Sequence, residues 1–132
     1  MVKLIQIILL LFVITSCAQI KNKNILLGKW QLITTNENDG GKPHTNEVKN
    51  GEILNFQDRN LLNNEKGEKG TYQLENDHLK IVLSGNTRQY LLWYDDKKNT
   101  VLHLTPVTEH YQLICDEGCS FTYVKKKEVL FC

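Results

Sequence analysis

Cysteine and histidine are the side chains of this chain best suited to metal binding or covalent chemistry, and it has four of each. None of the histidines lies in a His-Glu-x-x-His pair or near a Gly-x-Ser-x-Gly turn. Cys115, Cys119, Cys132 and His110 are a candidate zinc ligand set, but the spacing of the first two is not that of a Cys-x2-Cys knuckle. The sequence therefore favours a protein with no metal, no cofactor and no enzymatic active site.

Cys17 ends an apolar segment near the N-terminus. Residues 4–14 are apolar except for Gln6, and Lys3 precedes them. The segment is shorter than the roughly 20 residues that a membrane-spanning helix needs. The small residues Thr15 and Ser16 follow, which completes the order of a secretory leader. We expect residues 1–16 to be removed as a signal peptide.

The four residues that end this leader, Ile-Thr-Ser-Cys at 14–17, resemble the lipobox of bacterial lipoproteins. The resemblance implies that Cys17 carries lipid, such as palmitate, because two acyl chains hold a protein stably at a membrane. Residues 17–25 are then a tether, and the protein is anchored in the cell envelope. The absence of an acidic run after Cys17 favours the periplasmic side of the outer membrane. The alternative is an ordinary leader, with Cys17 free or paired.

The composition of the mature chain indicates one domain without a nucleic-acid partner. Without the leader, 116 residues remain, and their acidic and basic side chains are equal in number, 15 each. This length is typical of a single domain. A neutral surface lacks the basic face expected of a nucleic-acid-binding protein. The run of lysines at 125–127 is most simply a solvated strand end.

Short β-type segments separated by turn residues make up the rest of the chain, residues 26–132. No part of it keeps a helical apolar period for three turns. Regular short strands favour an all-β sandwich or barrel. The predicted strands are 26–35, 51–56, 61–64, 70–75, 78–83, 87–94, 100–105, 108–115 and 119–126. Residues 36–50 are polar and are expected to form a loop.

Cys115 and Cys119 are separated by three residues at the turn of the expected last hairpin. A loop of this length brings the two cysteines face to face, close enough for a disulfide bond. The pairing leaves Cys132 without a partner. An oxidised pair fits an exported protein.

The register of that hairpin follows from the same pair. Counting back by twos places Tyr111 opposite Tyr123 and Leu113 opposite Phe121 on one face. The opposite face is mostly polar, so we expect the aromatic face to point inward. Lys125 has the same inward parity at the end of the strand.

The first strand begins Gly28-Lys29-Trp30, which resembles the Gly-x-Trp motif of the lipocalin fold. The order of GEILNF, KGTYQLENDHLKI and SFTYVKK is similar to small lipocalin-like domains of bacterial lipoproteins. The resemblance implies an antiparallel up-and-down barrel of about eight strands over residues 26–132. It also implies that Trp30 plugs the closed end beneath a basic side chain of the last strand, here Lys125.

A barrel of this size either holds one small ligand or is filled by its own side chains. The resemblance implies a non-enzymatic protein that binds a small apolar molecule, with loop 36–50 over the open end. The candidate ligand-binding residues are Tyr90, Trp93, Tyr111, Phe121 and Tyr123. One alternative is a filled barrel that binds another envelope protein through its outer face or loops. A third class, an enzyme using the barrel mouth, is disfavoured because no acid–base constellation is visible.

The first prediction concerns the anchor. Replacing Cys17 with serine should remove acyl labelling and release the mature domain into the soluble fraction, since the thiol that takes the lipid is lost. Labelling with a fatty-acid probe followed by membrane fractionation measures both effects. A Cys17→Ser protein that still takes up the probe and stays in the membrane would show that the lipoprotein hypothesis is wrong.

Overall fold

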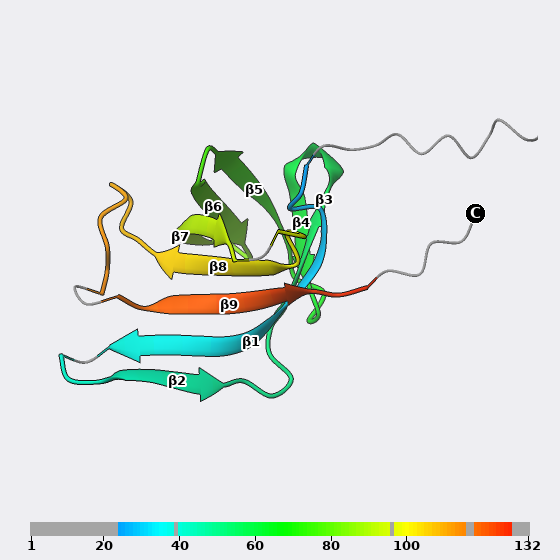
Figure 1. The fold of residues 1–132 in the computed structure, drawn as a ribbon. Helices are drawn as coiled ribbons and strands as arrows, with labels where there is room; N and C mark the ends of the chain where they lie inside the picture. Colours follow the sequence, from blue (N-terminus) through cyan, green and yellow to red (C-terminus); the bar gives the residue numbers. More distant parts are fainter. Residues whose placement is uncertain (1–23, 39, 96, 116–117, 128–132) are drawn as a thin grey trace, which may run out of the picture.

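The computed structural model describes residues 24–38, 40–95, 97–115 and 118–127 (Figure 1). The predicted signal peptide, the predicted lipidation site Cys17 and the remaining cysteine, Cys132, lie outside these ranges. The predictions that concern them are neither supported nor opposed by the fold.

Nine β-strands and one short 3-10 turn form the regular structure of the described residues. The strands are β1 (Gly28–Asn38), β2 (Pro43–Glu47), β3 (Ile53–Gln57), β4 (Leu61–Asn64), β5 (Lys69–Glu75), β6 (His78–Leu83), β7 (Asn86–Tyr94), β8 (Val101–Pro106) and β9 (Ser120–Lys125). The 3-10 turn, η1 (Asp58–Asn60), joins β3 to β4. The segment 61–64, the shortest of the predicted strands, is confirmed as β4.

Eight of these strands close into an antiparallel barrel. Each strand from β3 to β8 pairs with the next strand along the chain, and β1 pairs with both β3 and β9. The first residues of β1, 28–31, bond to β3 on one edge, and residues 30–36 bond to β9 on the other. The predicted all-β, up-and-down barrel of about eight strands is therefore confirmed.

The ninth strand, β2, lies where a loop was predicted. Residues 36–50 contain the end of β1 and all of β2, which pairs with β1 through residues 34–38 (Figure 1). All five residues of β2 are exposed, so its sequence, Pro-His-Thr-Asn-Glu, has no apolar alternation to reveal a strand. The prediction of a loop over the barrel mouth was wrong: this segment extends the sheet beside β1.

The predicted strand 108–115 is also absent, and the predicted last hairpin with it. Residues 107–119 connect β8 to β9, which pair directly, and Tyr123 faces Leu102 rather than Tyr111. Tyr111 has a φ of 58°, which breaks an extended strand, and Leu113 forms only an isolated bridge with Val107. The apolar–polar alternation of TEHYQLIC arises in a folded-back loop. Alternation of apolar and polar residues alone cannot distinguish an extended strand from a folded-back loop.

Alternation does identify the inner face of the strands that form. In β6 the buried residues are Leu79, Ile81 and Leu83, every second position. The inward parity predicted for Phe121, Tyr123 and Lys125 in β9 is confirmed: Phe121 and Tyr123 face the buried Leu104 and Leu102, and Lys125 lies over Trp30. A side chain pointing into the barrel is removed from water, whereas its neighbours are not. The hydrophobic pattern therefore sets the register of each strand.

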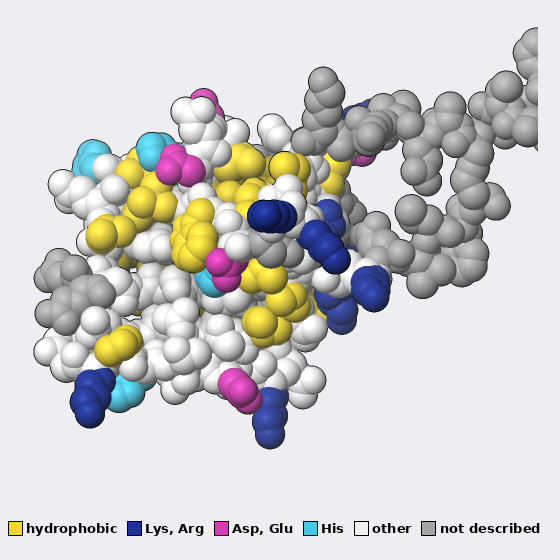
Figure 2. Space-filling view, in the orientation of Figure 1, with side chains coloured by type: hydrophobic (Ala, Val, Ile, Leu, Met, Phe, Trp, Pro, Cys, Tyr) yellow, Lys and Arg dark blue, Asp and Glu magenta, His cyan; other side chains and the backbone are white. Residues whose placement is uncertain are grey.

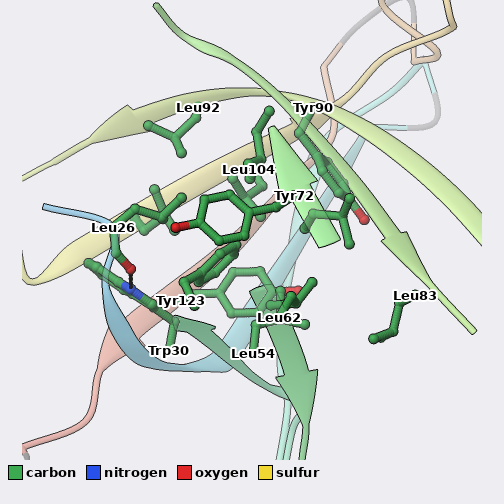
Figure 3. Close-up of a cluster of buried hydrophobic side chains, with 14 residues drawn as sticks. Leu26, Trp30, Leu54, Leu62, Tyr72, Leu83, Tyr90, Leu92, Leu104 and Tyr123 are labelled. Carbon is green, nitrogen blue, oxygen red and sulfur yellow. Dashed lines mark hydrogen bonds between the residues drawn. The ribbon is translucent and has the colours of Figure 1, made fainter. Parts of the chain in front are cut away.

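One end of the barrel is closed by Trp30, as the Gly-x-Trp resemblance implied. The indole is fully buried and donates its Nε1 hydrogen to the carbonyl oxygen of Leu26 at 2.8 Å (Figure 3). Lys125 Nζ lies 5.5 Å from the centroid of the ring. Gly28 has a φ of 117°, which favours glycine strongly over other residues. Gly28 therefore allows the chain to turn into β1 two residues before Trp30, the side chain that closes this end.

The second prediction compares the two tryptophans. Trp30→Ala should lower the free energy of unfolding by about 3–5 kcal/mol, since it leaves a cavity at the closed end. Trp93→Ala is the matched control, because Trp93 is 48% exposed on the outer surface and should cost about 1 kcal/mol, the value of its ring stacking. Urea denaturation of both variants measures the difference. Equal losses would contradict the role of Trp30 as the plug.

Candidate functional site

The interior of the barrel is filled by its own side chains. Figure 3 shows Trp30, Tyr72 and Tyr123 lying together inside the sheet. A cavity large enough for a ligand would expose the side chains that line it, but the residues of this cluster are each 7% exposed or less. They are Leu26, Trp30, Leu54, Phe56, Leu62, Tyr72, Leu79, Ile81, Leu83, Tyr90, Leu92, Leu102, Leu104 and Tyr123. The described core is packed as a protein interior rather than as a ligand chamber.

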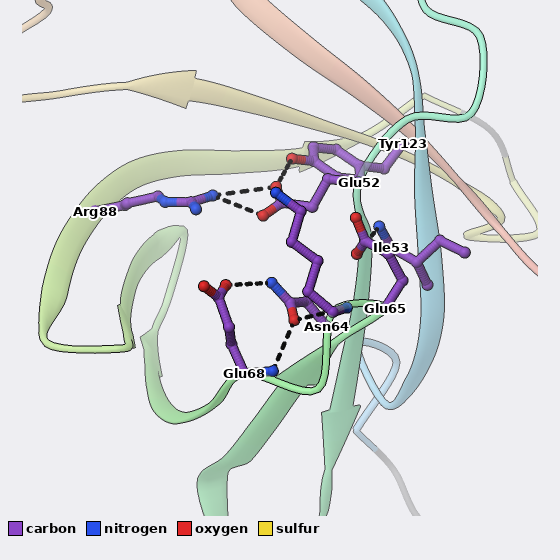
Figure 4. A network of polar contacts seen from close by, with 8 residues as sticks. Glu52, Ile53, Asn64, Glu65, Glu68, Arg88 and Tyr123 are labelled. Carbon is purple, nitrogen blue, oxygen red and sulfur yellow. Dashed lines mark hydrogen bonds and ion pairs between the residues drawn. The ribbon is translucent and has the colours of Figure 1, made fainter.

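The opposite end of the barrel is closed by charge rather than by an aromatic plug (Figure 4). Arg88 points inward from β7, and its Nη1 lies 3.0 and 3.1 Å from the two carboxylate oxygens of Glu52. Tyr123 donates its hydroxyl hydrogen to the same carboxylate at 3.2 Å. Glu52 therefore ties β7 and β9 together at the mouth. A ligand entering here would have to break these contacts.

Burial raises the pKa values of the tyrosines near this ion pair. For Tyr123 the main cause is loss of solvent, and the neighbouring Glu52 carboxylate raises the pKa further. For Tyr90 burial again dominates, and Arg88 partly opposes it. Both phenols are therefore held as neutral hydrogen-bonding groups in the folded protein.

The β4–β5 turn beside the mouth is held by the buried Asn64 (Figure 4). Its Oδ1 accepts hydrogen bonds from the backbone amides of Lys66 and Glu68, and its Nδ2 donates to the Glu68 carboxylate. Glu65 reaches across to accept the amide hydrogen of Ile53 at 2.9 Å. The backbone amides of this turn are thus satisfied by side-chain oxygens, and no further strand pairing is needed to satisfy them.

On the outer face of β7 to β9, a hydroxyl, an imidazole and a carboxylate lie in line. Thr122 Oγ1 is 3.0 Å from His103 Nδ1, and His103 Nε2 is 3.3 Å from a carboxylate oxygen of Asp95. This is the order of a nucleophilic triad, but the exposure is reversed: the hydroxyl is buried and the carboxylate is 61% exposed. A nucleophile must reach its substrate. The arrangement therefore does not supply nucleophilic catalysis.

Apolar side chains gather over this same outer face (Figure 2). Trp93 stacks on His103 with ring centroids 4.0 Å apart and is still 48% exposed. The segment 107–115 folds back over the sheet. Tyr111 in this segment stacks on His78 of β6, with the ring centroids 3.9 Å apart. This segment leaves Leu113 and Ile114 more than half exposed.

The structure separates the five candidate ligand-binding residues into two groups. Tyr90, Phe121 and Tyr123 point into the barrel, where they belong to the packed core or its margin. Trp93 and Tyr111 lie outside it. The five side chains therefore do not line one space.

Three residues with clear structural roles were missed from the sequence: Glu52, Arg88 and His103. Arg88 could have been found by parity, since it is two residues before the inward-facing Tyr90. Glu52 lies outside a strand and His103 is covered on an outer face, so neither carries a local signal.

The cysteine prediction is confirmed for the described pair. Cys115 and Cys119 form a disulfide bond, with their Cα atoms 5.7 Å apart. Neither sulfur is then available as a thiolate for zinc. Among the described residues there is no group of three His, Cys, Asp or Glu side chains placed to hold a metal ion. Nor does that part of the chain contain a helix of the length and hydrophobicity needed to cross a membrane.

Together these features define a closed antiparallel β-barrel with a filled interior, one aromatic end and one charged end. Comparison with models of known protein families finds no match, and comparison with curated proteins finds none either.

The third prediction follows from the raised pKa of Tyr123. Unfolding frees this phenol to ionise near its ordinary pKa of 10, whereas in the barrel it stays protonated. The contribution of the neutral Tyr123 phenol to the free energy of unfolding is therefore fully present below about pH 10, and it should be lost as the pH rises further. Tyr123→Phe should flatten this alkaline loss, as measured by urea denaturation between pH 8 and about 11. An unchanged pH dependence in the variant would contradict the assignment.

Proposed function

We propose that this protein is a lipid-anchored, non-enzymatic, lipocalin-like barrel of the cell envelope that binds a partner protein through its outer surface. The observation that carries the proposal is the filled interior. A ligand site in a protein is normally a concave space of several hundred cubic ångströms. Here the side chains that would line such a space touch one another instead.

The contact surface is proposed to be the outer side of β7 together with the segment 107–115, named here the β7 face. Its members are Leu91, Trp93, Leu113 and Ile114. The register places Leu91 between His78 of β6 and Thr105 of β8, so it faces outward beside the loop that covers part of the sheet. Tryptophan is enriched among the residues that dominate protein–protein binding energy.

The β7 face is also held in a fixed shape before any partner arrives. The Cys115–Cys119 disulfide closes the end of the segment that carries Leu113 and Ile114. Within it, the backbone amides of Gln112 and Tyr111 donate hydrogen bonds to the side chain and carbonyl of Thr108. A surface ordered in advance loses less conformational entropy on binding. Contact with a partner protein explains why these apolar side chains are ordered and yet exposed, whereas a role in the folding of the barrel does not.

A small apolar ligand is the competing hypothesis, and the two sealed ends argue against it. Trp30 closes one end, and the Glu52–Arg88 pair with Tyr123 closes the other. Entry would have to separate the Glu52–Arg88 ion pair and remove the hydrogen bond that Tyr123 donates to Glu52. The non-enzymatic part of the proposal is supported by the reversed exposure of the Thr122–His103–Asp95 set.

The fourth prediction tests the β7 face in the native envelope. A photo-crosslinking amino acid at position 93 or 113 should give one discrete protein adduct, because both positions lie on the proposed contact surface. The matched control is position 73, since Gln73 is exposed on β5 away from that face. Trp93→Ala should abolish the adduct formed from position 113. The adducts are identified by mass spectrometry.

Two results would overturn the proposal. One is equal crosslinking from positions 93, 113 and 73, which indicates nonspecific collision. The other is saturable binding of one fatty acid, sterol, retinoid or tetrapyrrole that Tyr90→Trp blocks from inside the barrel. The second result would restore the small-ligand hypothesis.

A further inference from the structure

A row of cationic and amide side chains crosses the outer surface of the barrel away from the β7 face. Lys29 pairs with Asn55 across β1 and β3, and Asn55 pairs with Asn63 across β3 and β4. On the other edge of β1, the amide of Lys126 donates to the carbonyl oxygen of Lys29 at 2.8 Å. Lys29 of β1 and Lys126, which directly follows β9, therefore lie next to each other.

These residues line a polar hollow of about 580 Å³. Its cationic wall is Lys29, Lys126 and Lys127, all exposed, and Asn55 and Asn63 line its other side. Among the described residues, no carboxylate forms an ion pair with any of the three lysines. The acid that also lines the hollow, Glu65, accepts a hydrogen bond from Ile53. The hollow thus presents positive charge and amide donors together, which suits a phosphate-bearing anion.

A second hollow, of about 600 Å³, adjoins the first through the shared residue Asn55. Its lining includes Leu27 and Leu61 as well as the oppositely charged Arg59 and Asp58. Leu61 is 46% exposed, and Ile25, at the same end of the barrel, is equally exposed. Apolar side chains beside a cationic hollow suit an amphiphile better than free phosphate.

Both described ends of the chain lie at this end of the barrel. Asn24 precedes β1, and Lys127 follows β9, whose arrow in Figure 1 points to the side where basic side chains gather in Figure 2. Only seven Cα-to-Cα steps separate Cys17 from position 24, with residues 18–23 between them. Fully extended, they span at most about 25 Å. An anchor at Cys17 would hold the lysine row close to the lipid headgroups.

We propose that this outer surface of β1, β3 and β4, named here the β1–β3 face, docks on an anionic lipid bilayer. The phosphate of an acidic headgroup is held between Lys29, Lys126 and Lys127, and Leu27 and Leu61 contact the glycerol and first methylenes of the lipid. The β7 face is then left open for a protein. The proposal uses the anchor at Cys17 only for proximity, since the charge and shape of the face do not depend on it.

The fifth prediction uses the full chain as its host produces it, purified in detergent and reconstituted on preformed vesicles. One set contains phosphatidylcholine alone, and the other has about a third of its lipid replaced by phosphatidylglycerol. Acetylation of each lysine is quantified by mass spectrometry. Lys29, Lys126 and Lys127 should react about fivefold more slowly on the anionic vesicles, the factor expected for one favourable contact of each lysine with the surface. High salt should remove the difference.

Matched variants separate docking from general charge attraction. Replacing Lys29, Lys126 and Lys127 with glutamine should abolish the salt-sensitive protection, read out on Arg59-containing peptides with an arginine reagent. The control replaces Lys66 and Lys80, which are outside the β1–β3 face, and should leave the protection intact. Leu61→Gln should weaken docking while keeping every charge of the face, so it separates loss of the apolar contact from a loss caused only by charge removal. Thermal unfolding confirms that each variant folds.

Failure of the proposed docking can be distinguished from failure of the proposed lipid anchor. Co-flotation with the neutral vesicles reports on lipid at Cys17, whereas the difference between the two vesicle types reports on docking. Equal reactivity of the three lysines on both vesicle types overturns the proposal. Equal protection by inorganic phosphate without vesicles also overturns it, since the face would then be a soluble anion site.

Discussion

Strand β1 bonds to neighbours along both edges, and the closure of the barrel depends on this. Its first residues pair with β3, and its middle pairs with β9, the strand farthest from it along the chain. A break in register between Leu32 and Thr34 lets the rest of the strand follow β9 away from β3. That departure leaves the edge to which β2 adds. Closure pairs β3 to β9 along both edges, which leaves these strands no edge to pair with another chain, whereas β2 pairs only with β1 among the described strands.

The two ends of the barrel are sealed by different chemistry. At one end a buried indole fills the space, and a lysine lies against its ring. At the other, the Glu52 carboxylate accepts hydrogen bonds from Arg88 and Tyr123. An aromatic plug tolerates a cation because the face of the ring is electronegative, whereas a carboxylate at the barrel mouth needs partners for its charge. Both seals leave the outer surface as the place of the two proposed contacts.

The outer surface carries two regions of opposite character. The β7 face is apolar and aromatic, with a disulfide-closed segment beside it. The β1–β3 face is cationic and polar, close to both described chain ends. A small domain whose interior is fully used for stability can still have two functions if each uses a separate side of the sheet. The proposed membrane contact and protein contact would then not compete for the same residues.

The sequence by itself determined the features whose signals are local. Alternation predicted most of the barrel strands and the inward side of β9, three intervening residues predicted the Cys115–Cys119 pair, and the Gly-x-Trp motif predicted the plug and its lysine. Only the tertiary structure decided the rest. The Glu52–Arg88 pair joins residues 36 positions apart, and the lysine row joins the first barrel strand to the last. Such contacts depend on which strands are neighbours, and hydrophobic periodicity reports which way a side chain points without naming the strand beside it.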